Sequence, residues 1–252
     1  MSEPEIVVTK DAAELASIAA RRFVQVVAGA QSEGRGATVA LSGGSTPRAL
    51  FTLLAGDEFN DKIDWRAVDV FWGDERTVPP DHADSNYRMA RETLLSHVPI
   101  PESRVHRMRG ELDPDDAARQ YESELASVFD GATPDNPPQF DLILLGLGGD
   151  GHTASLFPGT DALSVRDRLV VANPVPQQQT TRLSFTVPVL LASREVLFLV
   201  AGADKAPAVY RAIEGPWDPN QTPSQYLRQA HGHVVWLLDK AAAANLGDDA
   251  GG

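Results

Sequence analysis

The fold is decided by the stretch FDLILLGLGGDGHTASLFPGT, residues 140–160. Its first six residues are almost continuously apolar, which is typical of a central parallel strand with both faces buried. The run ends abruptly in four glycines, among which Asp150 and His152 are set. Glycine permits tight turns with positive φ and lets a ligand approach the backbone closely. Because open α/β sheets bind ligands at the carboxyl ends of their strands, we interpret this stretch as the catalytic corner of an enzyme.

The rest of the chain alternates apolar runs of strand length with segments of helical spacing. We expect further strands at residues 5–9, 37–41, 68–72, 105–108, 169–172, 181–186, 196–200 and 234–238. We expect helices at residues 11–30, 48–54, 84–97, 114–129, 206–213 and 223–229. This alternation predicts a single α/β domain over residues 1–246, with a mostly parallel sheet flanked by helices in a modified Rossmann-like arrangement. Residues 247–252 are expected to form a disordered tail.

Composition limits the classes of function. The chain has 252 residues, of which 42% are hydrophobic and 23% charged, as in an ordinary soluble globular protein. It has no cysteine, which excludes disulfides, thiolate metal sites and a cysteine nucleophile. No apolar run approaches the ~20 residues that span a bilayer, and the N-terminus lacks the order of a signal peptide, so we expect a cytoplasmic protein without a membrane partner. The net charge of −13 argues against nucleic-acid partners.

A second glycine-containing loop follows the strand expected at residues 37–41. It consists of Ser42, Gly43, Gly44, Ser45 and Thr46, and Pro47 then occupies the first helical turn. Free backbone amides and the helix dipole at such a helix N-terminus favour an anion, most often a phosphate. The spacing and the lysine of a Walker loop are absent. The alternative is an ordinary serine-capped helix after a tight turn.

Charged residues stand at further strand boundaries. Asp74, Glu75 and Arg76 follow the strand expected at residues 68–72, although they could also be a solvated loop whose charges pair with one another. Arg182 and Lys205 lie at later boundaries. Any anionic substrate must be held by such local positive groups against the overall negative field. The cations could bind that substrate or stabilise a developing oxyanion.

His152 is the candidate general base or acid. Unperturbed imidazole titrates near neutral pH, so it can take a proton from water and return it to a leaving oxygen. Asp150 could orient this histidine or the substrate. A lone histidine in a loop is usually structural or merely exposed, but the position of His152 at a glycine-rich strand end favours a catalytic role.

Three other chemistries fit the residues less well. Residues 146–151 match GxGxxG, but Pro158 cuts the following helix short and the next strand ends at Asn173 rather than at an acid, against a dinucleotide site. The serine-hydrolase pattern GxSxG fails at Pro47. The pairs Asp81–His82 and His231–His233 lack further ligands at usual spacings, so no metal is expected.

Three long blocks of the sequence resemble the 6-phosphogluconolactonase family. They are LSGGSTPRALF (41–51), FWGDERTVPPDHADSNYRMARETLL (71–95) and DLILLGLGGDGHTASLFPG (141–159), and RLSFT (182–186) and GADKA (202–206) match later segments. The family belongs to the glucosamine-6-phosphate isomerase/6-phosphogluconolactonase superfamily and implies its phosphosugar-isomerase-like fold. The resemblance implies hydrolysis of 6-phospho-D-glucono-1,5-lactone to 6-phospho-D-gluconate in the oxidative pentose phosphate pathway, without metal or organic cofactor.

The resemblance also implies roles for the candidate residues. His152 would activate the water that attacks the lactone carbonyl and then protonate the ring oxygen. Residues 42–46 would line the phosphate end of the substrate, and the cations Arg76, Arg182 and Lys205 would supply positive charge. Asp74 and Asp150 would position polar groups. Which cation meets the phosphate, and the oligomeric state, stay open.

Two alternatives remain. The related glucosamine-6-phosphate deaminase/isomerase family carries DEY where this chain has Asp74–Arg76, and a glutamate five residues after its histidine where this chain has Phe157. Without that carboxylate, the proton relay of an aldose–ketose isomerisation is incomplete. The other alternative is a non-catalytic sugar-phosphate-binding regulator. Such regulators usually carry a DNA-binding module, and no basic helix-turn-helix segment is present in the sequence.

Overall fold

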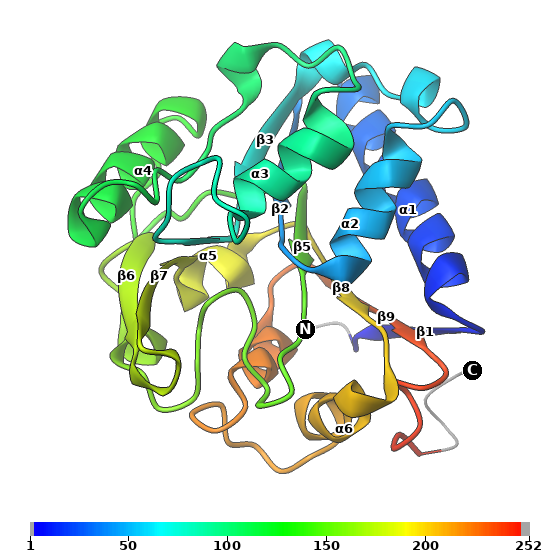
Figure 1. Ribbon diagram of the computed structural model, residues 1–252, viewed down its shortest axis with the longest axis vertical. Coiled ribbons are helices and arrows are strands. Elements are labelled where there is room, and N and C mark those ends of the chain that lie inside the picture. The colour runs from blue at the N-terminus through cyan, green and yellow to red at the C-terminus, as the bar shows by residue number, and fades with distance from the viewer. Residues whose placement is uncertain (1–2, 248–252) are drawn as a thin grey trace.

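A six-stranded parallel sheet forms the centre of the computed structural model, which describes residues 3–247 (Figure 1). Its strands are β1 (Glu5–Thr9), β2 (Ala37–Leu41), β3 (Val68–Trp72), β5 (Leu142–Leu145), β8 (Glu195–Val200) and β9 (His233–Asp239). Their order across the sheet is β1-β9-β8-β5-β2-β3, so β5 has a partner on each side. The predicted central parallel strand and the α/β class are confirmed. Of the tail predicted at residues 247–252, Gly247 donates its N–H to Oε1 of Glu214 at 3.0 Å, and residues 248–252 lie outside the described residues.

Helices cover both faces of this sheet. They are α1 (Ala12–Ser32), α2 (Ser45–Leu54), α3 (Asn86–Ala90), α4 (Pro114–Val128), α5 (Val187–Ala192) and α6 (Ala206–Ile213). Alternate residues of β5 enter two separate cores, as expected for side chains that point to opposite faces of a strand. Leu142 and Leu144 pack with α1 and α2, whereas Ile143 and Leu145 pack with α4, α5 and α6. The apolar run therefore reflects burial on both sides.

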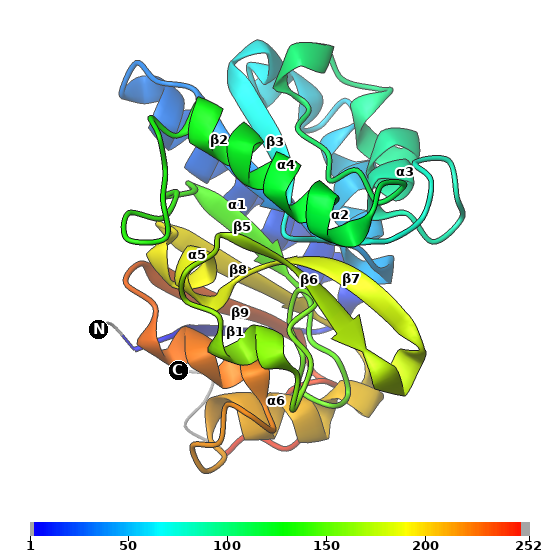
Figure 2. The same cartoon turned by 90° about the vertical axis from the view of Figure 1, so that its left-hand side faces the viewer.

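A smaller antiparallel sheet stands beside the parallel one. It has three strands in the order β4-β7-β6: β4 (Asp74–Arg76), β7 (Thr180–Phe185) and β6 (Val170–Val175). In Figure 2 the β6–β7 pair faces the viewer on the same side as α4, with α1 and α2 behind the parallel sheet. The sequence indicated β6 and β7 as strands but not that they form a separate sheet, and residues 74–76 were not predicted as a strand.

Gly73 explains where the second sheet begins. Its N–H donates to the carbonyl of Leu41 at 3.0 Å, as a continuation of the parallel pairing of β2 with β3. Its carbonyl accepts the N–H of Phe185 at 2.8 Å, which belongs to β7. The chain thus changes partners at this residue, and the charged triplet that follows is drawn into β4 rather than left as a loop.

Some other predicted elements differ in detail. Residues 105–108 do not form a strand: Val105 makes one isolated bridge to Val70, after which the chain turns away. The helix expected at residues 84–97 is α3 followed by a π-helical turn at Arg91–Leu95, where the amide of Ser96 donates to the carbonyl of Arg91 at 3.1 Å. Residues Pro223–Gln229 form a 3₁₀ helix, and α5 was not predicted. Within residues 3–247, none of the helices has the length and apolarity to cross a membrane.

Candidate active site

Most of the predicted site residues line one cavity of about 280 Å³ at the carboxyl edge of the parallel sheet. The predicted residues that line it are Ser42, Gly43, Gly44, Asp74, Arg76, His152, Arg182 and Lys205. They come from the loops after β2, β5 and β8 and from the strands β4 and β7. Ser45 and Thr46 begin α2, next to this lining. Asp150 lies beside His152 and contacts it directly. The topology therefore gathers residues that are far apart in the sequence.

The glycine-rich loop after β5 holds His152 against Asp150. Oδ1 of Asp150 lies 2.6 Å from Nδ1 of His152 and accepts the backbone N–H of the same residue at 3.1 Å. Gly148 donates its N–H to the carbonyl of His152 at 2.9 Å, and a Cβ on Gly148 would lie 2.0 Å from Nδ1. This position therefore requires glycine. With the carboxylate at Nδ1, the other ring nitrogen, Nε2, is left for a substrate or water.

The charge on Asp150 suits this contact. Burial alone would raise the pKa of Asp150, but the hydrogen bonds and charge of His152 outweigh it, so the pKa lies below its ordinary value. The carboxylate is thus ionised at neutral pH and can orient the imidazole. One face of the ring is also held, because Phe157 stacks on His152 with the ring centroids 4.1 Å apart.

The loop between β2 and α2 presents backbone groups to the cavity. Gly44, the N-cap of α2, has φ of +111°, a conformation that L side chains rarely adopt. No side chain caps this helix, so the amides of its first turn are left for another partner. Those amides and the positive end of the dipole of this ten-residue helix favour an anion.

Two arginines face each other across the small sheet. Arg76 of β4 and Arg182 of β7 are direct partners in the antiparallel register. Burial, followed by the nearby charge of Arg76, lowers the pKa of Arg182. Within residues 3–247 neither guanidinium makes a salt bridge, although Arg76 donates to the carbonyl of Asp84 and Arg182 to Oε1 of Gln178 at 2.9 Å. An anion bound between them would relieve the repulsion of these like charges.

The two acids of the triplet point to different partners. Asp74 is buried and accepts the hydroxyl of Ser155 at 2.7 Å, and both residues line the cavity. Glu75 is also buried but faces the turn at residues 85–87 rather than the cavity. Of the triplet, Asp74 and Arg76 therefore line the cavity and Glu75 does not, and their role in ligand binding stays a prediction. The alternative of a solvated loop fits neither acid.

Sequence reasoning did not select several residues that line the cavity. They include Asn86, Leu147, Ser155 and Gln178. In the sequence, Asn86 is recognisable only as a residue at the start of a helix. The structure confirms that start, because Ser85 caps α3 by accepting the N–H of Arg88 at 3.1 Å. In the sequence, Phe157 only distinguishes the chain from the deaminase family. Its stacking on His152 could not be predicted, because it depends on the path of the loop between them. Among the described residues, no group of three or more histidine and acidic side chains is arranged to hold a metal ion.

Comparison with known proteins extends this picture. Residues 10–236 match the family model described as glucosamine-6-phosphate isomerases/6-phosphogluconolactonase. A 6-phosphogluconolactonase of Synechocystis is 48% identical over 83% of this chain and 84% of its own length. The solved structure of 6-phosphogluconolactonase from Trypanosoma cruzi superposes with a TM-score of 0.84 at 33% identity, covering 98% of each chain.

A structure from the alternative enzyme class is also similar. A monomeric glucosamine-6-phosphate deaminase superposes with a TM-score of 0.78, covering 96% of this chain and 99% of its own. Its sequence identity is only 23%, so this likeness concerns the fold alone. The phosphosugar-isomerase-like fold is therefore confirmed, and the choice between the two chemistries depends on the site.

Proposed function

The chain belongs to the 6-phosphogluconolactonase family, and from that premise we propose that it hydrolyses 6-phospho-D-glucono-1,5-lactone to 6-phospho-D-gluconate. One observation carries the proposal: a single cavity joins an aspartate-held histidine, two arginines and the N-terminal end of α2. A histidine activates water, and the cations and amides bind anions. The substrate needs both, since it carries a phosphate and an electrophilic carbonyl.

His152 acts as the base and then as the acid of this proposed mechanism. Nε2 takes a proton from a water molecule, and the water oxygen bonds to C1 of the lactone. The carbonyl electrons move to its oxygen, and Arg76 stabilises the resulting oxyanion. As the carbonyl re-forms, the bond from C1 to the ring oxygen breaks, and His152 returns the proton to that oxygen. The new carboxylic acid ionises to give 6-phosphogluconate.

The remaining predicted residues bind and orient the substrate in this proposal. Residues 42–46 receive the phosphate, and Arg182 and Lys205 add positive charge to the same cavity. Asp74 fixes Ser155 at the cavity wall, and Asp150 keeps the imidazole in place. No step in this sequence requires an electron or group carrier, because water is the only second reactant.

Phe157 is the observation that favours hydrolysis over deamination. Its ring covers one face of His152, and it occupies the sequence position at which the deaminase family carries the glutamate that assists sugar ring opening. A phenylalanine can neither accept nor donate a proton. Hydrolysis of a lactone needs only an activated water and a stabilised oxyanion, and both have candidate residues here.

Two turnover assays on the purified protein test the proposal. The first follows proton release from freshly generated 6-phosphoglucono-1,5-lactone, corrected for spontaneous hydrolysis. The second follows ammonia release from glucosamine 6-phosphate. We expect fast lactone turnover that a chelator does not change, and no ammonia. Ammonia release would show deaminase chemistry. The absence of turnover in both assays would favour a sugar-phosphate-binding protein.

A further inference from the structure

Asn86 lies inside the cavity and has no role in the mechanism above. Its side chain is 3% exposed and stands between the loop after β2 and the strand β4. Nδ2 donates to the backbone carbonyl of Asp74 at 3.0 Å and lies 3.4 Å from Oδ1 of the same residue. These bonds orient the amide, so its oxygen points the other way.

The amide oxygen of Asn86 faces the proposed phosphate loop. A Cβ built on Gly43 would lie 1.9 Å from Oδ1 of Asn86, so the glycine leaves the space that this oxygen occupies. Within residues 3–247, no donor reaches Oδ1 within hydrogen-bond distance. Because Asn86 lines the cavity, a ligand bound there can supply the donor that the protein does not provide. The asparagine is therefore prepared to accept a hydrogen bond from the cavity.

The type of partner follows from the chemistry of the amide oxygen. An acceptor requires a donor, and a phosphate that is fully ionised offers only acceptor oxygens. The hydroxyl groups of a sugar lactone are donors. Nδ2 can point at most one further hydrogen into the cavity, because the other is bonded to Asp74. A hydroxyl of the sugar, rather than its phosphate, is the matching group.

Glu75 holds Asn86 in this place. The Glu75 carboxylate accepts the N–H of Asn86 at 2.8 Å, the N–H of Tyr87 at 2.8 Å and the hydroxyl of Ser85 at 3.1 Å. It also accepts the N–H of Arg76 at 2.8 Å, which completes four bonds from the strand and the turn together. Burial raises the pKa of Glu75 against these bonds, and in the described part of the chain no cation forms a salt bridge with it.

A buried carboxylate without a cationic partner is costly and needs a compensating role. The bonds of Glu75 link β4 directly to the turn that begins α3, ten residues further along the chain. If the turn moved, Asn86 would leave both Gly43 and Asp74. The function of this carboxylate is therefore to fix the geometry of the turn.

We propose that Asn86 binds a sugar hydroxyl of the substrate and that Glu75 is the positioning residue that holds Asn86 in the cavity. The proposal rests on the proposed lactonase function and adds a contact that selects for the sugar part of the substrate. A hydroxyl contact of this kind exists in the bound substrate and in the transition state alike. Its loss therefore raises KM and leaves kcat nearly unchanged.

The test compares Asn86→Ala, Glu75→Gln and the double variant in the lactone assay. We expect Asn86→Ala to lower kcat/KM about ten-fold, mostly through KM, as for one lost neutral hydrogen bond. Glu75→Gln should act in the same direction. In the Asn86→Ala background it should have no further effect on KM, because it acts through Asn86. Additive effects of the two substitutions would overturn the positioning role.

Inhibition by inorganic phosphate separates a hydroxyl contact from a general distortion. Asn86→Ala should leave the inhibition constant of phosphate unchanged, since the phosphate loop is intact. An equal loss of phosphate and substrate affinity would overturn the proposal. Asn136→Ala and Glu92→Gln, both exposed and outside the cavity, are the matched controls and should equal the parent. If Glu75→Gln does not fold, Ser85→Ala removes one of the four bonds and should raise KM less.

Calorimetric titration with 6-phosphogluconate keeps this inference separate from the proposed function. If the parent protein hydrolyses no lactone, the lactonase proposal fails. The inference is then supported when the parent binds 6-phosphogluconate about ten-fold more tightly than Asn86→Ala, and it is overturned when the two bind equally.

Discussion

At the scale of single residues, the proposed chemistry depends on His152. We expect His152→Ala to lower kcat by about 10²–10⁴-fold, the usual contribution of a positioned general base, while 6-phosphogluconate still binds. The measurement is steady-state lactone turnover together with calorimetric titration. His82→Ala, which removes a half-exposed histidine outside the cavity, should keep the parent kcat. Full turnover in His152→Ala would contradict the assignment of the base.

Arg76 should contribute to binding and to the transition state. Replacement of Arg76 by Ala removes positive charge from the cavity and should raise the barrier in kcat/KM by about 2–4 kcal/mol. It also removes the like charge opposite Arg182, so the lowered pKa of Arg182 should rise towards its ordinary value. Lactone kinetics test the first effect. Arg119→Ala, an exposed arginine on α4, serves as the control and should keep kcat/KM unchanged.

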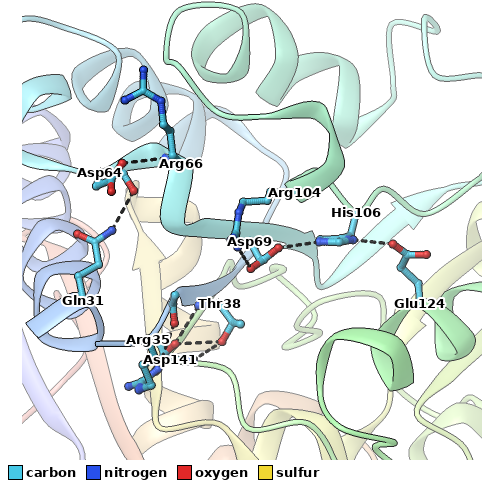
Figure 3. Close-up of polar contacts among 11 residues, drawn as sticks. Gln31, Arg35, Thr38, Asp64, Arg66, Asp69, Arg104, His106, Glu124 and Asp141 are labelled. Carbon is cyan, nitrogen blue, oxygen red and sulfur yellow. Dashed lines mark hydrogen bonds and ion pairs between the residues drawn. The ribbon is translucent and has the colours of Figure 1, made fainter. Parts of the chain in front are cut away.

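His106 makes the stability of the fold depend on pH. Its Nε2 lies 3.0 Å from Asp69 of β3 and its Nδ1 lies 2.6 Å from Glu124 of α4, while Arg104 also pairs with Asp69 (Figure 3). Burial lowers the pKa of His106, but the two carboxylates outweigh it and the pKa is raised above its ordinary value. The stabilisation is thus fully present below the unfolded pKa and is lost as pH rises through the folded pKa.

The variant His106→Gln tests this pH dependence. Relative to the parent, it should lose on the order of 1–3 kcal/mol of unfolding free energy below the ordinary histidine pKa of about 6.5. The difference should shrink as the pH rises through the raised pKa of the parent. Urea denaturation at pH 5.5, 7 and 9, within the range of about pH 5–9 where exposed carboxylates are ionised, measures it. A difference that grows with pH would contradict the sign.

At the scale of elements, the turn between β2 and α2 tolerates no side chain at Gly43. Gly43→Ala would place a Cβ 1.9 Å from Oδ1 of Asn86, so the loop and α3 must separate. We expect kcat/KM to fall at least ten-fold while circular dichroism stays that of the parent. Gly29→Ala is the matched control: it lies within α1, its Cβ meets nothing within 4 Å, and it should raise stability by up to about 1 kcal/mol.

The elements also show how far the sequence determines the structure. The pattern around β5 predicted a buried central strand and a histidine at its end because both depend on local residues. The pairing of β4 with β7 could not be predicted, since it depends on Gly73 meeting Phe185, more than a hundred residues away. The position of Asn86 in the cavity could not be predicted for the same reason. Its place depends on Glu75 and Gly43, which only the folded chain brings together.

At the scale of the whole molecule, two cores meet at the parallel sheet. Leu144 of β5 is fully buried in the core shared with α1 and α2. We expect Leu144→Ala to lower the free energy of unfolding by about 2–5 kcal/mol, from lost burial and the cavity left behind. Urea denaturation measures this loss. Val8→Ala, at a position 39% exposed, should change stability by less than about 1 kcal/mol. Comparable losses in both variants would contradict this view of the core.

The double pairing of Gly73 has a consequence for how such a site can diversify. The parallel sheet carries the histidine and the loop at residues 42–46, whereas the small sheet carries both arginines and is hydrogen-bonded to the turn of Asn86. In the proposed mechanism, the acid–base group and the two arginines therefore stand on two sheets, which Gly73 links directly. A change in the β6–β7 hairpin would reach β5 as well, because Leu183 and Phe185 of β7 pack in one core with Ile143 and Leu145 of that strand. Because Arg76, which stabilises the oxyanion in the proposed mechanism, is paired with Arg182 of this hairpin, substrate preference and hydrolysis would change together.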